Sequence, residues 1–102
     1  MGIEEKPREF EKIVDVSSEV IERYVGTYEL VPDVVFTIST QDGKLLAGLT
    51  GQPTQRIFPR SETEWFYRVV KATITFKLDA NGQCNELELF QNEARRTAKR
   101  IE

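Results

Sequence analysis

Apolar and polar residues alternate along much of this chain. VVFTIST (residues 34–40) places Val34, Phe36 and Ile38 on one side of an extended backbone, and KATITFKL (71–78) alternates in the same way. A period of two residues is typical of strands that bury one face. These segments therefore predict half-buried β-strands.

Turn-forming residues divide the chain into segments of similar length. The breaks fall at Asp42-Gly43, Gly51-Gln52-Pro53, Asp79-Ala80-Asn81-Gly82 and Gln91-Asn92-Glu93. Short extended segments joined by tight turns of this kind are typical of an antiparallel meander. The spacing predicts about eight strands of roughly five to eight residues each.

A short polar segment before the first strand has the features of a helix. Asp15 or Ser17 can cap its N-terminus, and the helix would continue to about Arg23. Gly26 can end it. The sequence therefore predicts one helix ahead of the strands.

Together these elements predict an all-β fold, an eight-stranded antiparallel up-and-down barrel with a short N-terminal helix. The short links disfavour Greek-key crossovers, and closure is favoured over a sandwich because it removes the exposed edges of an open meander. At 102 residues the chain has room for one core. We expect a charged N-terminal extension or linker at 1–15 and a single barrel domain at 16–102.

Aromatic residues are the natural filling for such a barrel. We expect five aromatic residues to fill its interior, namely Phe36, Phe58, Trp65, Phe66 and Phe76. Alternatively, they could line a cup that holds one small ligand. The segment EWFYRVV is predicted to be a strand in which Trp65 and Tyr67 share one face and Phe66 takes the other. Aromatic surface on the outer face needs a cover, which the helix, a further domain or a partner could provide.

Composition and charge restrict the function classes. Apolar residues make up 39% of the chain, and 14 basic against 17 acidic residues give a net charge of −3. This balance is that of an ordinary globular domain and argues against a general nucleic-acid binder. No apolar run is long enough to span a membrane, and the N-terminal residues do not resemble a signal peptide, so localisation stays open.

The chain is poor in catalytic groups. It contains no histidine, one cysteine (Cys84), no Ser-x-x-Lys motif and no glycine-rich phosphate loop. We therefore expect no cofactor, no metal and no catalytic residue. Two carboxylate pairs, Glu62 with Glu64 and Glu86 with Glu88, are a weak alternative that is better explained as solvated strand faces.

Four segments between Val16 and Ile101 resemble a known domain family. They are IERYVGTYEL, FTISTQDGKLLAGLTGQPTQRIFPRSETEWFYR, ATITFKLDANGQ and LELFQNEARRTAKRI. The shared features are a Tyr-x-Gly-x-Tyr start, an Asp-Gly followed by Leu, a Leu-x-Gly-Gln, a Leu/Phe-x-Pro-x-Ser before paired aromatics and a Phe-x-x-Asp-x-x-Gly turn. In their order and spacing, these features resemble a domain found at the C-terminus of serine hydrolases of the penicillin-binding-protein and class C β-lactamase type. This domain is usually described as a domain of unknown function.

The resemblance implies a lipocalin-like barrel without catalysis of its own. In the parent enzymes, which are commonly exported, a catalytic domain precedes the barrel, and the barrel packs near the active-site cleft. The implied partner is thus a serine hydrolase catalytic domain, in the same longer chain or in another one. The family usually has a glycine where Glu93 stands, which leaves the geometry of the last hairpin open.

No position in this chain matches the catalytic serine, lysine or tyrosine of the parent enzymes. The candidates for contact with a neighbouring domain or a ligand are Gly51, Gln52, Pro53, Trp65, Phe66 and Tyr67. The first hypothesis is a non-catalytic accessory domain that docks on a serine hydrolase to gate its active site or to support assembly. The alternative is a stand-alone barrel that binds a small apolar ligand in its interior.

Overall fold

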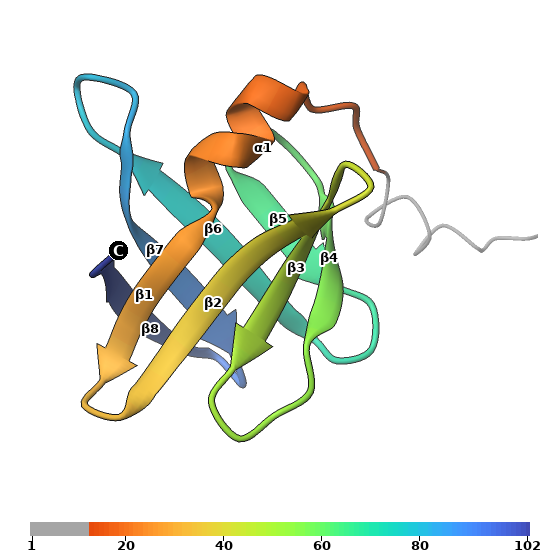
Figure 1. The fold of residues 1–102 in the computed structure, drawn as a ribbon. Coiled ribbons are helices and arrows are strands. Elements are labelled where there is room, and N and C mark those ends of the chain that lie inside the picture. The colour runs from red at the N-terminus through yellow and green to blue at the C-terminus, as the bar shows by residue number, and fades with distance from the viewer. Residues whose placement is uncertain (1–12) are drawn as a thin grey trace, which may run out of the picture.

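The computed structural model describes residues 13–102, which form a closed barrel of eight antiparallel strands with one short helix (Figure 1). The elements are α1 (Ser18–Tyr24), β1 (Gly26–Val31), β2 (Val34–Gln41), β3 (Lys44–Leu49), β4 (Gln55–Pro59), β5 (Glu64–Tyr67), β6 (Ala72–Leu78), β7 (Cys84–Gln91) and β8 (Ala94–Arg100). Each strand pairs with the next one along the chain, and β1 pairs with β8 to close the barrel. The predicted all-β, up-and-down barrel is confirmed.

The predicted N-terminal extension, 1–15, falls mostly on residues 1–12, which lie outside the described residues. Of its last three residues, Val14 contacts the barrel, because its backbone N–H donates to the carbonyl of Pro59 at 3.1 Å. The domain boundary at residue 16 stays a prediction.

Strand β5 is shorter than the sequence predicts. The pattern of EWFYRVV indicates a strand through Val70, but the strand ends at Tyr67. The next four residues form a bend in which the N–H of Ala72 donates to the carbonyl of Val70 at 3.1 Å. The bend returns the chain into β6 and leaves two valines outside the sheet.

One apolar core fills the barrel. Its largest fully buried side chains are Trp65, Tyr24, Tyr28, Phe36, Phe76, Ile38, Leu45, Ile57, Ile74 and Leu87. Among the described residues, no charged side chain is buried. Burial alternates along the strands as the period of two predicts.

Two of the five aromatics expected inside the barrel lie on its outer face instead. Phe58 and Phe66 are paired across β4 and β5, with their rings tilted by 32° and the centroids 5.9 Å apart, and neither belongs to the core cluster. The prediction that they fill or line the interior is wrong. The reason is alternation: Trp65 is buried in the core, and therefore its neighbour on the same strand points outward.

Helix α1 lies across one end of the barrel (Figure 1) and packs on its core. The Ser17 side chain accepts a hydrogen bond from Val20 N–H, which confirms one of the two predicted caps. Tyr24, the last helical residue, stacks on Phe76 with ring centroids 4.1 Å apart. Its hydroxyl donates to the carbonyl of Glu62 at 2.7 Å. Aromatic stacking and this hydrogen bond hold the helix in place as a lid.

The turn from the helix into β1 requires a glycine and an arginine. A Cβ at Gly26 would lie 2.6 Å from the carbonyl oxygen of Glu102 and 2.9 Å from Nε of Arg100. The Arg100 guanidinium donates to the carbonyls of Arg23, Cys84 and Val25 at 3.2, 2.9 and 2.7 Å. Arg100 thus links the end of α1 to β7 and β8, and Gly26 leaves the room that it occupies.

The last hairpin has a tight two-residue turn, although Glu93 stands where the resemblance implies a glycine. Asn92 and Glu93 both have positive φ, 55° and 62°. The β2–β3 turn has the same conformation at Asp42 and Gly43, with φ of 55° and 78°. Glu93 therefore adopts a left-handed backbone that a glycine would accept at lower cost.

Candidate functional site

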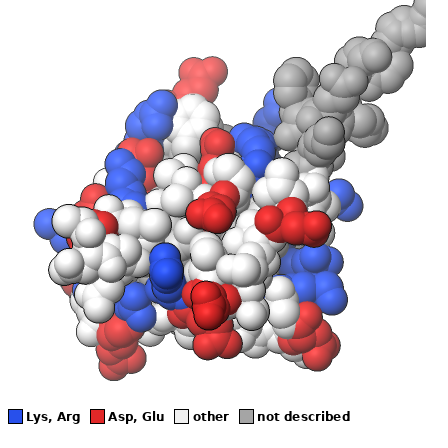
Figure 2. Space-filling model, turned by 90° about the horizontal axis from the view of Figure 1, so that it is seen from above, with Lys and Arg blue, Asp and Glu red and all other residues white. Residues whose placement is uncertain are grey.

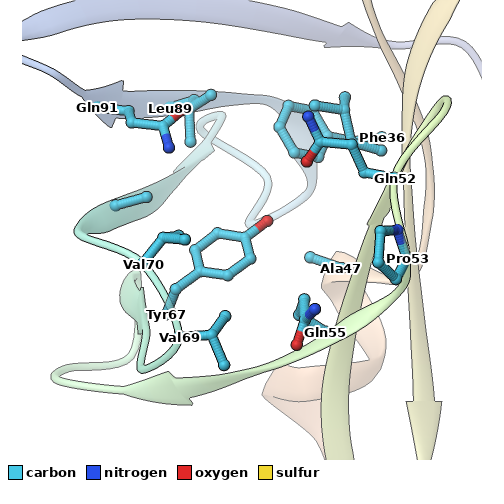
Figure 3. A pocket seen from close by; sticks show the side chains of 12 residues that line it. Phe36, Ala47, Gln52, Pro53, Gln55, Tyr67, Val69, Val70, Leu89 and Gln91 are labelled. Atoms are coloured by element: carbon cyan, nitrogen blue, oxygen red, sulfur yellow. The ribbon is translucent and has the colours of Figure 1, made fainter.

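The end of the barrel opposite α1 is open and contains a cavity of about 120 Å³. We call it the mouth cavity. Figure 3 shows its lining, and the Tyr67 ring reaches from β5 into the middle of it. The lining residues are Phe36, Ala47, Leu49, Gln52, Pro53, Gln55, Tyr67, Val69, Val70, Ala72, Leu89 and Gln91.

The cavity exists because small residues occupy two inward-facing positions. Ala47 on β3 and Ala72 on β6 are both buried, and both line the cavity. Larger buried side chains, such as Leu45 and Ile74, occupy the next inward positions along the same strands. An alanine at such a position leaves unfilled volume unless a neighbour reaches across. Tyr67 does so only in part.

The polar groups at the mouth are neutral. Gln55 and Gln91 are half-buried, and Gln52 is exposed on the β3–β4 loop. Burial of the Tyr67 hydroxyl raises its pKa to about 12, because desolvation disfavours the phenolate. The hydroxyl is thus protonated at neutral pH and is available as a hydrogen-bond donor. No lining residue carries a charge.

The β3–β4 loop is fixed on one side of the mouth by Thr50. The Thr50 hydroxyl oxygen accepts from the N–H of Val35 at 2.9 Å, and the Thr50 N–H donates to the carbonyl of Val35 at 3.1 Å. The N–H of Gln52 donates to the carbonyl of Leu49 at 2.8 Å. These contacts hold Gln52 and Pro53 against the cavity.

On the other side, the bend between β5 and β6 presents two exposed valines. Val69 is 64% exposed and Val70 is 47% exposed, and both line the cavity. Adjacent branched apolar side chains with this much exposure form an apolar rim. The opening therefore combines an apolar rim with neutral amides.

The structure separates the six predicted site residues. Gln52, Pro53 and Tyr67 line the mouth cavity, and Gly51 lies in the same loop as the first two. Trp65 is buried near the α1 end, where its Nε1–H donates to the carbonyl of Glu62 at 3.0 Å. Phe66 lies on the outer face.

Sequence reasoning missed four lining residues with distinct chemistry, namely Gln55, Val69, Val70 and Gln91. The sequence pattern predicts a strand for the two valines, and one face of such a strand is buried. The two glutamines occupy inward-facing strand positions, and the alternation of β4 and β7 is the signal that could have identified them.

Arginines cover the outer aromatic pair. The guanidinium carbons of Arg56 and Arg68 lie 4.2 and 4.5 Å from the Phe58 ring centroid, and that of Arg60 lies 5.1 Å from the Phe66 centroid. Stacked guanidinium groups remove apolar ring surface from water and stay solvated at their edges. This face is therefore covered by the chain itself.

The α1 end is covered by the helix, although a hollow of about 180 Å³ lies beside it, lined in part by Val16, Ile21, Lys44 and Arg56. The helix itself is held by hydrogen bonds. The Tyr28 hydroxyl donates to the carbonyl of Tyr24 at 2.9 Å and lies 3.2 Å from the sulfur of Cys84. Burial raises the pKa of both the Tyr28 hydroxyl and the Cys84 thiol. Cys84 is consequently a protonated, enclosed thiol. From above, Figure 2 shows acidic and basic side chains interspersed at this end.

The carboxylate pairs do not converge on the mouth. Glu64 contacts Arg60 at 3.4 Å, Glu88 contacts Arg95 at 3.3 Å, and none of the four carboxylates lines the cavity. Glu62 precedes β5, so it does not share a strand face with Glu64 as the sequence predicts. Within residues 13–102, no group of three metal-ligating side chains is present, and no helix is long and apolar enough to cross a membrane.

Comparison with known proteins identifies the family. Residues 11–101 match the model described as Domain of unknown function (DUF3471). The chain is also similar to Penicillin-binding protein 4* of Bacillus subtilis (strain 168), with 29% identity over 76 residues, which are 74% of this chain and 17% of that protein. No solved structure matches significantly. Because the family model covers nearly the whole chain, the chain belongs to the family Domain of unknown function (DUF3471).

Proposed function

We propose that this lipocalin-like barrel is a non-catalytic accessory domain of a β-lactamase-related serine hydrolase. It packs on the catalytic domain through its mouth, where it gates the active site or supports assembly. The observation that carries the proposal is the exposed apolar rim of Val69 and Val70 beside a pre-formed cavity. Exposed apolar surface next to a cavity is typical of a site that another protein covers.

The asymmetry of the barrel supports docking through the mouth. Helix α1 occupies the other end, and arginines cover the aromatic pair on the outside of β4 and β5. The mouth combines a cavity with exposed apolar side chains and hydrogen-bonding side chains. Protein interfaces commonly combine apolar contacts with hydrogen-bonding groups in this way.

The similarity to a penicillin-binding protein supports the class of partner. The matched segment is 17% of that protein's length, so most of the relative lies outside the match and has room for a catalytic domain. The missing histidine and Ser-x-x-Lys motif in this chain support a non-catalytic role.

The volume of the mouth cavity argues against the alternative, a stand-alone carrier of an apolar ligand. Pockets for ligands of ordinary size measure roughly 300–1,000 Å³. The cavity of about 120 Å³ is well below this range. A stand-alone binding role would therefore be restricted to very small apolar molecules.

The test uses the penicillin-binding relative with its matching segment deleted. We expect the chain to bind this protein and to change its hydrolysis rate or its oligomeric state, measured with a chromogenic ester and by light scattering. Val69→Asp combined with Val70→Asp should abolish binding, whereas Ala80→Asp, on the exposed turn between β6 and β7, should not. No binding, together with unchanged activity and assembly of the deleted enzyme, would refute the proposal.

A further inference from the structure

We propose that the mouth cavity binds a single apolar amino-acid side chain together with the peptide groups that flank it. The occupant is an uncharged peptide segment. In the accessory role proposed above, on which this assignment rests, the segment belongs to the partner catalytic domain.

The volume of the cavity limits the occupant to one side chain. A protein cavity of about 150 Å³ holds one benzene-sized molecule. The mouth cavity, at about 120 Å³, fits an aliphatic side chain of the size of leucine and is too small to enclose an acyl chain of a lipid. The side chain would enter between Ala47 and Ala72, whose small size creates the space.

The charge of the lining restricts the occupant further. All twelve lining residues are uncharged, and the deepest of them, such as Phe36 and Leu89, are apolar and buried. A carboxylate or ammonium group brought into this cavity would lose its hydration without finding an opposite charge. Acidic and basic side chains are therefore excluded.

The polar groups match a peptide backbone. Gln52, Gln55 and Gln91 each provide one carbonyl acceptor and one amide donor group, and Tyr67 adds a hydroxyl. No hydrogen bond of these four side chains to another residue is present within residues 13–102. Peptide groups present one donor and one acceptor each, whereas a hydrocarbon ligand could use neither.

The positions of the apolar and the amide side chains fit a peptide whose side chain enters first. The apolar lining residues Phe36, Ala47 and Ala72 are buried, whereas Gln52 is exposed and Gln91 is half-buried, beside the exposed valines of the rim. Figure 3 shows the glutamine side chains around the cavity. A side chain that points inward would therefore leave its own backbone beside the amides.

The test is a titration of the chain with capped amino acids, followed by NMR of the methyl groups of Ala47 and Ala72 and of the Tyr67 ring. We expect N-acetyl-leucine methylamide to bind with a Kd on the order of 1 mM, as a ligand with about 13 heavy atoms should. N-acetyl-glutamate methylamide should produce no saturable shift. Equal binding of the two compounds, or no saturable shift with the leucine compound, would overturn the proposal.

Variants that fill the cavity give the second arm. Ala47→Leu should weaken binding of the leucine compound at least tenfold, and Ala72→Leu is an independent filling variant if the first does not fold. Ala80→Leu is the matched control, because it adds the same side chain on an exposed turn. Unchanged affinity in the folded filling variants would refute the assignment, as would micromolar binding of laurate with shifts at Tyr67.

The outcomes separate this inference from the accessory role. If the filled variants still bind the hydrolase as the unmodified chain does, the side-chain site is wrong and the accessory role stands. If the leucine compound binds at the mouth but the chain never binds the hydrolase, the site stands and the accessory role fails.

Discussion

Replacing Glu93 with glycine should stabilise the barrel. Glu93 occupies the second position of the two-residue turn between β7 and β8, with φ of 62°, and Asn92 before it also has positive φ. The equivalent position of the β2–β3 turn is Gly43, with φ of 78°. The chain thus provides one turn with the favoured glycine and one without it.

The expected gain in the free energy of unfolding is the strain relieved in the turn minus the extra chain entropy that glycine loses on folding. The left-handed conformation costs a residue other than glycine about 1–2 kcal/mol. Glycine loses about 0.4–1 kcal/mol more than other residues through its greater freedom in the unfolded chain. Glu93→Gly should therefore raise the free energy of unfolding by about 0.5–1 kcal/mol, which for a chain of this length is about 2–8 °C in Tm.

Urea denaturation followed by tryptophan fluorescence measures this, since Trp65, the single tryptophan, is buried. Glu93→Gln is the control, because it removes the charge and keeps the backbone constraint. Gly43→Glu should have the opposite effect, with a loss of about 0.5–1 kcal/mol. A Glu93→Gly variant no more stable than Glu93→Gln would refute the reasoning, since the left-handed turn would then carry no cost.

Three further predictions concern the packing of the barrel. Arg100→Lys should lower the free energy of unfolding by about 2–4 kcal/mol, because an ammonium group cannot reach the three carbonyls that the guanidinium contacts. In the same urea experiment, Arg96→Lys, at an exposed position, should have little effect. Gly26→Ala should cost about 1–3 kcal/mol, since its Cβ would lie 2.6 Å from the Glu102 carbonyl oxygen, and unchanged stability would contradict this packing. Because the pKa of Tyr67 rises to about 12 on folding, its contribution to stability is complete below about pH 10 and is lost as the pH rises toward 12. Between about pH 9 and about pH 11, the urea midpoint should therefore fall less for Tyr67→Phe than for the unmodified chain. An equal fall in both proteins would contradict the raised pKa of Tyr67.

The sequence predicted the barrel because its signals are local. The alternation in VVFTIST, the Asp42-Gly43 turn and the Ser17 cap each depend on a few neighbouring residues, and the structure contains all three. The mouth cavity depends on register instead. Ala47 and Ala72 belong to different strands, and only the closed barrel brings them to the same cavity. The site predicted from the sequence combines one loop with one strand, so it includes Gln52 but not Gln55 and Gln91, which lie on other strands.

The outer aromatic pair bears on where we propose that a partner docks. Aromatic side chains on both faces of β5 require a cover on the outside, and the sequence left open whether a helix, a domain or a partner provides it. The cover comes from Arg56, Arg60 and Arg68, which stack on Phe58 and Phe66. The stacked arginines cover the two rings, although Nε of Arg60 is buried without a hydrogen-bond partner within residues 13–102. The valines at the mouth have no such cover within residues 13–102, since Val69 remains 64% exposed. Exposed apolar surface therefore favours docking at the bend after β5 over docking at the outer face of β5.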